Sequence, residues 1–339
     1  MRQTLFFRLL IFALLLTTGV VVLGAYVRLS DAGLGCPDWP GCYGNMIVPS
    51  DPDTVTEANA SYPNRAMEAD KAWKEMIHRY FAGLLGMLVL ALAVIAWRNR
   101  SDPRQPTVLP WFLVALIVFQ SMLGMLTVTW LLKPLIVMGH LLGGLATLSL
   151  LWWLALRTGR LFSPANYPES DRWRFLAVVG LVVVVCQIAL GGWTSANYAA
   201  LACPDFPTCQ GRWWPETDYG EAFTLWRGIG VDYEGGVLDN AARVAVHLTH
   251  RIGAVVTFLY LGLFGLWLWR KGDQSAVRNV GLALCLVLTL QVALGITTVI
   301  GHLPLPVAVA HNAGAALLLL TTVAVNHVLR SGGEPAPWT

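Results

Sequence analysis

The chain has 339 residues, of which 56% are hydrophobic and 13% charged, and its formal net charge at pH 7 is +3. Soluble domains carry about 25% charged residues, so this composition disfavours a soluble enzyme and a disordered chain. The Lys and Arg residues form short clusters rather than one basic face, which argues against a nucleic-acid partner. The 15 Trp and 32 Gly residues favour a membrane protein, in which Trp lines the interfaces and Gly allows close helix packing.

Eight stretches of the sequence are long and apolar enough to span a bilayer, which takes about 20 residues in a helix. None of them alternates with period two, as the strands of a membrane β-barrel would. The first is expected to stay in place rather than to be cleaved as a signal peptide, because its apolar run is long and no small-x-small site follows. We therefore predict an all-α integral membrane protein. The approximate spans are Phe6–Val27, Glu75–Trp97, Leu109–Trp130, Leu135–Leu156, Trp173–Ser195, Ala242–Trp269, Val277–Ile300 and Leu305–Leu329.

The distribution of Lys and Arg predicts that both termini lie on the inner side of the membrane, an N-in/C-in orientation. Thirteen of the 23 Lys and Arg residues then fall in the inner segments, together with only five of the 20 acidic residues. No mitochondrial transit peptide precedes the first span, so we expect a multi-pass protein of the bacterial plasma (inner) membrane. Two large loops, about residues 28–74 and 196–241, then lie on the outer, periplasmic side, where we expect the chemistry.

The two halves of the chain match each other in order and spacing, which indicates an internal duplication. The matched segments, 167 to 172 positions apart, are Gly33–Cys42 with Ala200–Cys209, Glu75–Arg79 with His247–Arg251, Gln120 with Gln291, and His140 with His311. Four crossings return the chain to its starting side, so the repeats are expected to be parallel. We predict two tandem four-helix bundles, residues 1–160 and 161–339.

Four of the seven histidines lie near the outer ends of the even-numbered spans: His78, His140, His250 and His311. An ionisable side chain inside a bilayer is a functional candidate, and a facing His pair in a helical bundle can hold a haem iron between two axial nitrogens. An interhelical hydrogen bond is the simpler explanation for any one of them, but four repeat-related positions favour two haem sites. Two equivalent pairs fit poorly to zinc, which needs three or four converging ligands. Because Cys-x-x-Cys-His is absent, any haem is expected to be bound without covalent attachment.

Each large loop contains a Cys-x5-Cys pair around a Pro-Asp-aromatic-Pro motif, Cys36 with Cys42 and Cys203 with Cys209. The outside of a bacterial plasma membrane is oxidising, so we expect a disulfide in each loop. A structural role is the simpler one for the second pair, whereas a redox role stays open for the first, because short-loop disulfides can be reducible.

The remaining His and Cys residues receive simpler interpretations. His302 and His327 are expected at surface or interfacial positions. Cys186 and Cys285 lie in the middle of spans and are interpreted as small apolar core residues. His247 differs from these, because it occupies the position that matches Glu75 in the first half.

Together these features resemble the haem A synthase family over essentially the whole chain. The resemblance rests on Glu75-x-x-His78-Arg79, His140, His250-Arg251, His311, the paired-Cys loops and the two four-helix halves. It implies oxidation of the C8 methyl group of haem O, through hydroxylation, to the formyl group of haem A for cytochrome oxidase. It also implies a resident haem b as cofactor and the haem O synthase (protohaem farnesyltransferase) as an upstream partner. The sequence leaves open the electron partner, the oxygen source and whether the chain forms a homo-oligomer.

The resemblance gives the two His pairs different roles. His250 and His311 match the ligands of the resident haem b, whereas His78 and His140 match the ligands of the substrate haem in the N-terminal half. Glu75 matches an acidic residue that the family needs for activity. The first-loop Cys pair matches one thought to take part in electron transfer, although some family members lack it.

An asymmetry between the halves supports a special role for Glu75. Glu75 and His78 are three residues apart and share a helix face, so only the first haem is expected to have a carboxylate neighbour. Such a carboxylate can move protons or stabilise a developing cation. The alternative is an ion pair between Glu75 and Arg79. Arg79 and Arg251 are expected to bind haem propionates or, alternatively, to extend to the membrane interface.

Two other classes of protein are compatible with parts of the pattern. A non-enzymatic dihaem b electron carrier would use the same four histidines but would not need Glu75 in one half only. A transporter is disfavoured by the parallel repeat and by the lack of broken, charge-bearing helix centres. Extracted haem distinguishes these classes, because a carrier would contain two equivalents of haem b and a synthase would contain some haem O or haem A.

Overall fold

The computed structural model describes residues 2–159, 170–272 and 274–330, and within these ranges the chain forms ten helices and no strand. Eight of the helices are long and apolar enough to cross a membrane. The prediction of an all-α multi-pass membrane protein is thus confirmed, and each helix lies on an expected span. The eight are α1 (Arg2–Leu29), α3 (Ala69–Arg98), α4 (Val108–Thr129), α5 (Pro134–Thr158), α6 (Ser170–Ala196), α8 (Asn240–Lys271), α9 (Ser275–Ile300) and α10 (Leu305–Val328).

Helix α3 differs most from its expected span, because it begins at Ala69 rather than at Glu75. Its first turns are polar, so an apolar run does not reveal them. Lys74 Nζ lies 2.6 Å from the Asp70 carboxylate at i,i+4 spacing, which supports this part of the helix. Glu75 and His78 therefore lie well inside α3 and have a rigid backbone.

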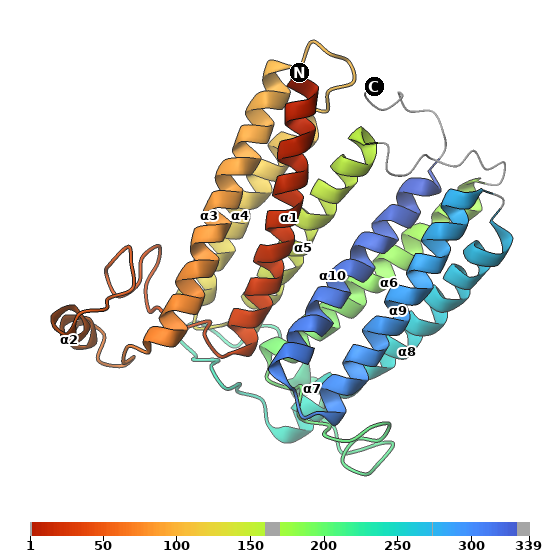
Figure 1. Ribbon diagram of the computed structural model, residues 1–339. Coiled ribbons are helices and arrows are strands. Elements are labelled where there is room, and N and C mark those ends of the chain that lie inside the picture. The colour runs from red at the N-terminus through yellow and green to blue at the C-terminus, as the bar shows by residue number, and fades with distance from the viewer. Residues whose placement is uncertain (1, 160–169, 273, 331–339) are drawn as a thin grey trace.

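Two short helices, α2 (Pro52–Ser61) and α7 (Tyr219–Ala222), are not among the predicted elements. Each begins at an aspartate that caps it. Asp51 accepts a hydrogen bond from the Thr54 amide at 3.0 Å, and Asp218 accepts one from the Glu221 amide at 3.0 Å. Both lie at the same end of the helix bundle, opposite the end at which α1 begins and α10 ends (Figure 1).

The α4–α5 and α9–α10 connections are tight turns of the same geometry. Each contains two successive non-glycine residues with positive φ, Leu131 (50°) and Leu132 (59°) in one turn and His302 (56°) and Leu303 (63°) in the other. In both turns the amide of the second residue donates to a carbonyl oxygen of the preceding helix at 2.8 Å. Helices α5 and α10 consequently start alike, and each carries its candidate histidine in its second turn.

The eight long helices pack as two groups of four. In the first group α1 and α4 each pack against α3 and α5, and in the second α6 and α9 each pack against α8 and α10. Helices α3 and α5 are therefore diagonal partners, as are α8 and α10. The groups meet where α1 contacts α10 and where α5 contacts both α6 and α10.

The predicted duplication, the division into residues 1–160 and 161–339, and the N-in/C-in orientation stay predictions. The proposed boundary lies in a segment outside the described residues. The first helix group has an aliphatic core of its own, with Leu85 and Leu151, whereas the core around Leu261 in the second group also includes Leu145 and Leu148 of α5.

Two expectations about single residues are wrong. His327 is fully buried rather than superficial, and its ring meets that of Trp153 edge-on at a centroid distance of 5.6 Å. Cys186 is exposed on the surface of α6, whereas Cys285 is half-buried. Lipid tails are as apolar as a protein core, so an apolar residue in mid-span does not have to face inward. His302 is exposed, as expected.

Candidate functional site

The four candidate histidines belong to the two pairs of diagonal helices. His78 lies on α3 and His140 on α5, whereas His250 lies on α8 and His311 on α10. All four are half-buried. Diagonal helices of a four-helix group face each other across its interior, which is where bundles build cofactor sites. The arrangement therefore gives each group one candidate pair.

A glycine on a neighbouring helix makes room for each of the four imidazoles. A side chain at Gly24, Gly191 or Gly295 would crowd the ring, whereas one at Gly124 would lie at ordinary contact distance. The distance from an added Cβ to the nearest imidazole atom is 2.9 Å for Gly24 and His78, 3.4 Å for Gly124 and His140, 3.1 Å for Gly191 and His250, and 2.9 Å for Gly295 and His311. Sequence reasoning missed these glycines as site residues, although Gly124 and Gly295 end the matched Gln-x-x-Leu-Gly strings.

His250 and His311 line one cavity of about 570 Å³. This volume is within the range of about 300–1,000 Å³ that is typical of ligand and cofactor pockets. Part of the wall comes from the other helix group, through Val21, Ala25 and Arg28 of α1. A mostly apolar cavity with two imidazoles from opposite helices fits a haem with two axial nitrogen ligands.

Gln187 of α6 fixes the ring of His250. Its Nε2 lies 3.1 Å from His250 Nδ1 and donates to the His250 carbonyl oxygen at 3.0 Å. Gly253 leaves room for this amide, because a Cβ there would lie 2.3 Å from Gln187 Oε1. A partner on one ring nitrogen orients an imidazole and leaves the other nitrogen for a metal. In the first group the matching residue is Val20, whose side chain cannot form a hydrogen bond.

The carboxylate of Asp38 orders the first disulfide hairpin. Cys36 and Cys42 are bridged, as predicted. The two Asp38 oxygens accept hydrogen bonds from the amides of Tyr43 at 2.6 Å and Gly44 at 2.8 Å. Aspartate commonly ties a turn to following amides in this way, which explains the acidic residue within the Pro-Asp-aromatic-Pro motif.

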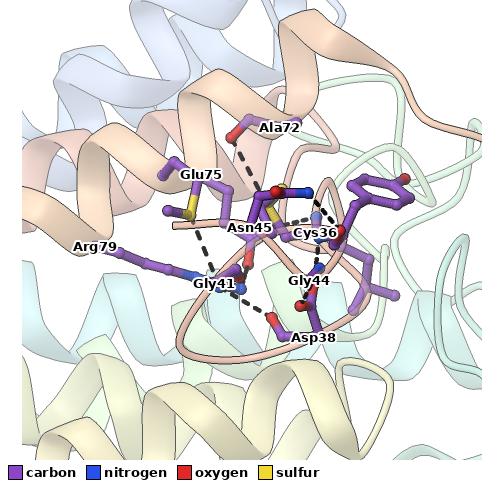
Figure 2. Close-up of a disulfide and its surroundings, with 12 residues drawn as sticks. Cys36, Asp38, Gly41, Gly44, Asn45, Ala72, Glu75 and Arg79 are labelled. Atoms are coloured by element: carbon purple, nitrogen blue, oxygen red, sulfur yellow. Dashed lines mark hydrogen bonds and ion pairs between the residues drawn. A yellow bond between two sulfur atoms is a disulfide. The ribbon is translucent and has the colours of Figure 1, made fainter. Parts of the chain in front are cut away.

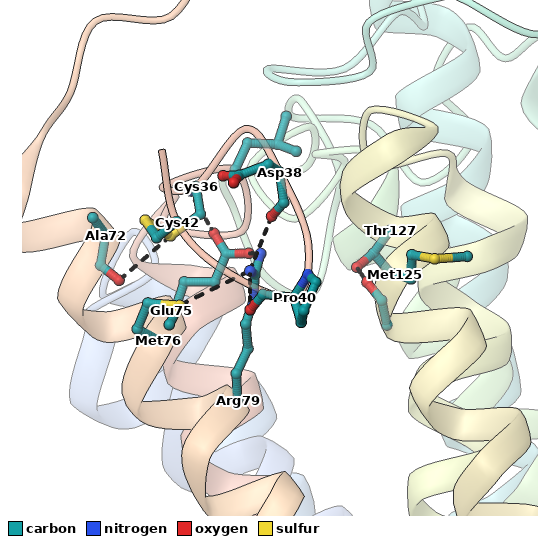
Figure 3. A network of polar contacts seen from close by, with 12 residues as sticks. Cys36, Asp38, Pro40, Cys42, Ala72, Glu75, Met76, Arg79, Met125 and Thr127 are labelled. Carbon is teal, nitrogen blue, oxygen red and sulfur yellow. Dashed lines mark hydrogen bonds and ion pairs between the residues drawn. A yellow bond between two sulfur atoms is a disulfide. The ribbon is translucent and has the colours of Figure 1, made fainter. Parts of the chain in front are cut away.

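Glu75 joins this hairpin to helix α3 (Figure 2). Its Oε2 accepts a hydrogen bond from the Cys36 amide at 2.9 Å, and its Oε1 is paired with the Arg79 guanidinium. Arg79 Nη1 also donates to the carbonyl oxygens of Asp38 at 2.9 Å and Pro40 at 3.2 Å (Figure 3). The Glu75 side chain is only 7% exposed. A buried carboxylate needs such partners, because burying an unpaired charge is costly.

The second hairpin is anchored by the same geometry with one chemical difference. Cys203 and Cys209 are bridged, as predicted. Arg251 Nη2 and Nη1 donate to the carbonyl oxygens of Cys203 and Thr208, both at 2.8 Å. Arg251 Nε lies 3.3 Å from His247 Nε2. His247 thus accepts a hydrogen bond from Arg251 at the position where the first hairpin has the carboxylate of Glu75.

The i,i+4 ion pair between Glu75 and Arg79, considered from the sequence as the alternative role of Glu75, is therefore present, and Glu75 also lies one helical turn before His78. Arg79 and Arg251 each follow a candidate histidine and hold the hairpin of their own half. Their expected contact with propionates stays a prediction. Each arginine therefore connects its hairpin directly to the helix that carries the neighbouring histidine.

Both disulfides should protect their cysteines from alkylation. Without a reductant, Cys36, Cys42, Cys203 and Cys209 should remain unlabelled in the denatured protein, and all four should label after reduction. Peptide mass analysis measures this directly. Full labelling of both members of a pair before reduction would refute the disulfide in that pair.

The second hairpin should be stable to low pH. Hydrogen bonds from the Thr208 hydroxyl, and further bonds from the amides of Gly211 and Gln210, lower the pKa of Asp205 from 3.8 to about 2. A lowered pKa stabilises the fold at pH values above the unfolded value, and this contribution is lost as the pH falls through the folded value. Asp205→Asn should therefore speed reduction of the Cys203–Cys209 disulfide by a phosphine at neutral pH. The rate ratio of variant to wild type should stay constant down to about pH 4 and approach one near pH 2. A ratio of one at pH 7 would show that the carboxylate does not stabilise the hairpin.

Two groups of four spanning helices, each with a diagonal His pair beside a disulfide hairpin, define a multi-pass membrane protein built around two related sites. The family model described as cytochrome oxidase assembly protein matches residues 7–323, and the chain belongs to this family. A haem A synthase of Shewanella oneidensis is 47% identical over 95% of this chain and 96% of its own length. Haem A synthases of Halalkalibacterium halodurans (30% identity, 92% of this chain and 93% of the relative) and Caulobacter vibrioides (29%, 90% of each) are also similar.

Proposed function

We propose that the protein is a haem A synthase, a membrane oxidoreductase that converts the C8 methyl group of haem O to a formyl group by successive hydroxylation. Its membership of the cytochrome oxidase assembly family supports this function. The 47% identity to the Shewanella oneidensis haem A synthase, over nearly the whole of both chains, supports it further. The haem A product would then be used in the assembly of cytochrome oxidase.

We place the substrate haem in the N-terminal helix group, with His78 and His140 as its candidate ligands. The observation that carries this assignment is the buried carboxylate of Glu75, one helical turn from His78. The matching residue in the other group is His247. Oxidation of a methyl group requires the removal of protons, whereas electron transfer through a haem does not, so the group with the carboxylate suits the substrate.

The contacts of Glu75 leave it able to react. Its Oε2 contacts the Cys36 amide and its Oε1 contacts Arg79, and a carboxylate oxygen can accept more than one hydrogen bond. Glu75 can therefore take up a proton from the substrate, or stabilise positive charge that develops beside the porphyrin, while its position stays fixed. Arg79 balances the charge of the carboxylate and holds its orientation.

We propose that His250 and His311 hold a resident haem b in the C-terminal cavity. Such a haem would supply one-electron redox chemistry. The chain's own contribution is to hold the ligands in place, because Gln187 orients His250 and the glycines at positions 191 and 295 keep the space at the imidazoles open. Arg251 lines this cavity and fixes the second hairpin at its rim.

The proposed setting is a bacterial plasma membrane with both disulfide hairpins on the periplasmic side. The two disulfides support this, because they form in oxidising compartments. Substrate would come from a haem O synthase (protohaem farnesyltransferase), the enzyme class that makes farnesylated haem.

Haem analysis of a host that makes no haem A of its own tests the function. The protein should be expressed with and without a supply of haem O, and extracted haems should be separated and identified by mass. Haem A is expected only when both the protein and haem O are present. Two equivalents of haem b in the purified protein, with no haem O or haem A in either host, would instead support an electron carrier.

A further inference from the structure

We propose that Arg28 of α1 binds a propionate carboxylate of the haem in the C-terminal cavity, so that the N-terminal helix group completes the cofactor site of the other group. The proposal rests on the function proposed above, since it takes the ligand of this cavity to be a haem. The cavity lining and the hydrogen bonding of Arg28 carry it.

Arg28 lies in the last turn of α1 and reaches across to α6. Its Nη2 donates to the Ser195 carbonyl oxygen at 2.6 Å, and its guanidinium carbon lies 4.2 Å from the centroid of the Tyr198 ring. Arg28, Ser195 and Tyr198 all line the cavity that contains His250 and His311. The guanidinium is thus held rigidly at the cavity wall.

The guanidinium of Arg28 has donors that are not fully used within the described part of the chain. Its Nε is buried and has no hydrogen-bond partner among the described residues. Its Nη1 is 3.8 Å from Asp31, whose side chain is 61% exposed, so this contact is long and mostly in water. A buried unsatisfied donor is costly, and a carboxylate is the acceptor that best matches the planar arrangement of guanidinium donors.

The other arginine that lines the cavity is less available. Each of the three nitrogens of Arg251 has a partner, namely the Thr208 carbonyl, the Cys203 carbonyl and the His247 ring. Of the two lining arginines, Arg28 is therefore the one with a buried nitrogen that lacks an acceptor.

The residue that matches Arg28 in the second half is Ser195, 167 positions later, and Ser195 is also the residue whose carbonyl oxygen Arg28 contacts. Arg28 therefore lines the C-terminal cavity, and the matching position of the second half has no arginine that could line the site of the first half. Helix α1 also separates the two sites, since Val21 and Ala25 line the C-terminal cavity and Gly24 packs against His78. A propionate held by Arg28 would lie beside the helix that also contacts the substrate ligand.

A comparison of two haems tests the proposal in the full-length protein. Wild-type apoprotein, Arg28→Gln and Arg28→Lys would be titrated with iron protoporphyrin IX and with its dimethyl ester, which lacks the carboxylate charges. Wild type should bind the free acid about 10- to 100-fold more tightly than the ester, as expected for a charged hydrogen bond. Arg28→Gln should lose most of this preference, and Arg28→Lys should keep part of it. The midpoint potential of the bound haem should be lower in Arg28→Gln, because an unbalanced carboxylate stabilises ferric iron.

Arg65→Gln is the matched control. Arg65 also connects the two halves, through Asp232 at 3.3 Å and Glu234 at 3.0 Å, but it does not line the C-terminal cavity. This variant should keep both the preference for the free acid and the potential. An equal loss in Arg65→Gln and Arg28→Gln would mean that bridging the halves, not binding a carboxylate, is the role of Arg28.

The remaining outcomes separate this proposal from the proposed function. If wild type binds no haem in a manner that depends on His250 and His311, the proposed function is wrong. If wild type binds haem but binds the ester equally well, or if Arg28→Gln keeps the preference and the potential, only the role of Arg28 is wrong. The ester comparison in wild type needs no substitution, so equal binding of the two haems would overturn the proposal even if Arg28→Gln does not fold, and Arg28→Lys then measures the share of Arg28 in any preference.

Discussion

Haem A should disappear from cells whose only copy of this enzyme carries Glu75→Ala, and haem O or its hydroxymethyl derivative should accumulate. Loss of one proton-transfer group typically lowers a rate by about 10² to 10⁴. The purified variant should still contain the proposed C-terminal haem b, because Glu75 lies in the other helix group. Chromatography of extracted haems measures the first effect, and the haem b content of the purified protein measures the second.

Two further variants distinguish chemistry from structure at Glu75. Glu75→Gln can keep a hydrogen bond with the Cys36 amide but loses the charge, so it should be nearly as inactive as Glu75→Ala if the carboxylate reacts. His247→Gln changes the matching position beside the other hairpin and should cost much less activity. If His247 proves essential and Glu75 dispensable, the roles of the two helix groups must be exchanged.

Loss of either proposed axial ligand of the C-terminal haem should empty that site. His250→Ala and His311→Ala each leave an iron with one protein ligand, which is more easily lost. We expect both variants to purify with little haem b, and any haem that remains to lose its low-spin spectrum. His78→Ala and His140→Ala should instead keep haem b and make no haem A. Wild-type haem content and a low-spin spectrum in both C-terminal variants would refute these ligand assignments.

The sequence predicts the spanning helices well because a bilayer imposes one simple requirement on them, a long apolar run. The search for a long apolar run does not detect helical segments that are polar or short. The first turns of α3 are supported by the Asp70–Lys74 pair rather than by apolar residues, and α2 depends on the cap formed by Asp51. Burial was predicted least well. Cys186 is exposed, because lipid and protein interiors accept similar apolar side chains, and His327 is buried against the ring of Trp153.

The candidate site follows from the sequence only in part. The predicted repeat identifies the histidines and the cysteine pairs, because they recur at matched positions, and it identifies Glu75 because the matched position has His247 instead. It does not reveal that Arg79 and Arg251 hold the hairpins, since a carbonyl partner has no signature in the side-chain sequence. Nor does it identify Arg28, whose partner belongs to the other helix group and whose own repeat position is a serine.

The position of α1 between the two sites has a consequence for how this molecule could have evolved from a smaller one. A duplicated four-helix unit would begin as two equivalent halves, each able to pair with a copy of itself. Once one half supplies part of the wall of the other's cavity, as Val21 and Ala25 do, the halves are no longer interchangeable. A gene fragment encoding only the second bundle would then produce an incomplete pocket. Selection would accordingly keep both halves in one reading frame, the more so because the core of the second group also includes Leu145 and Leu148 of α5.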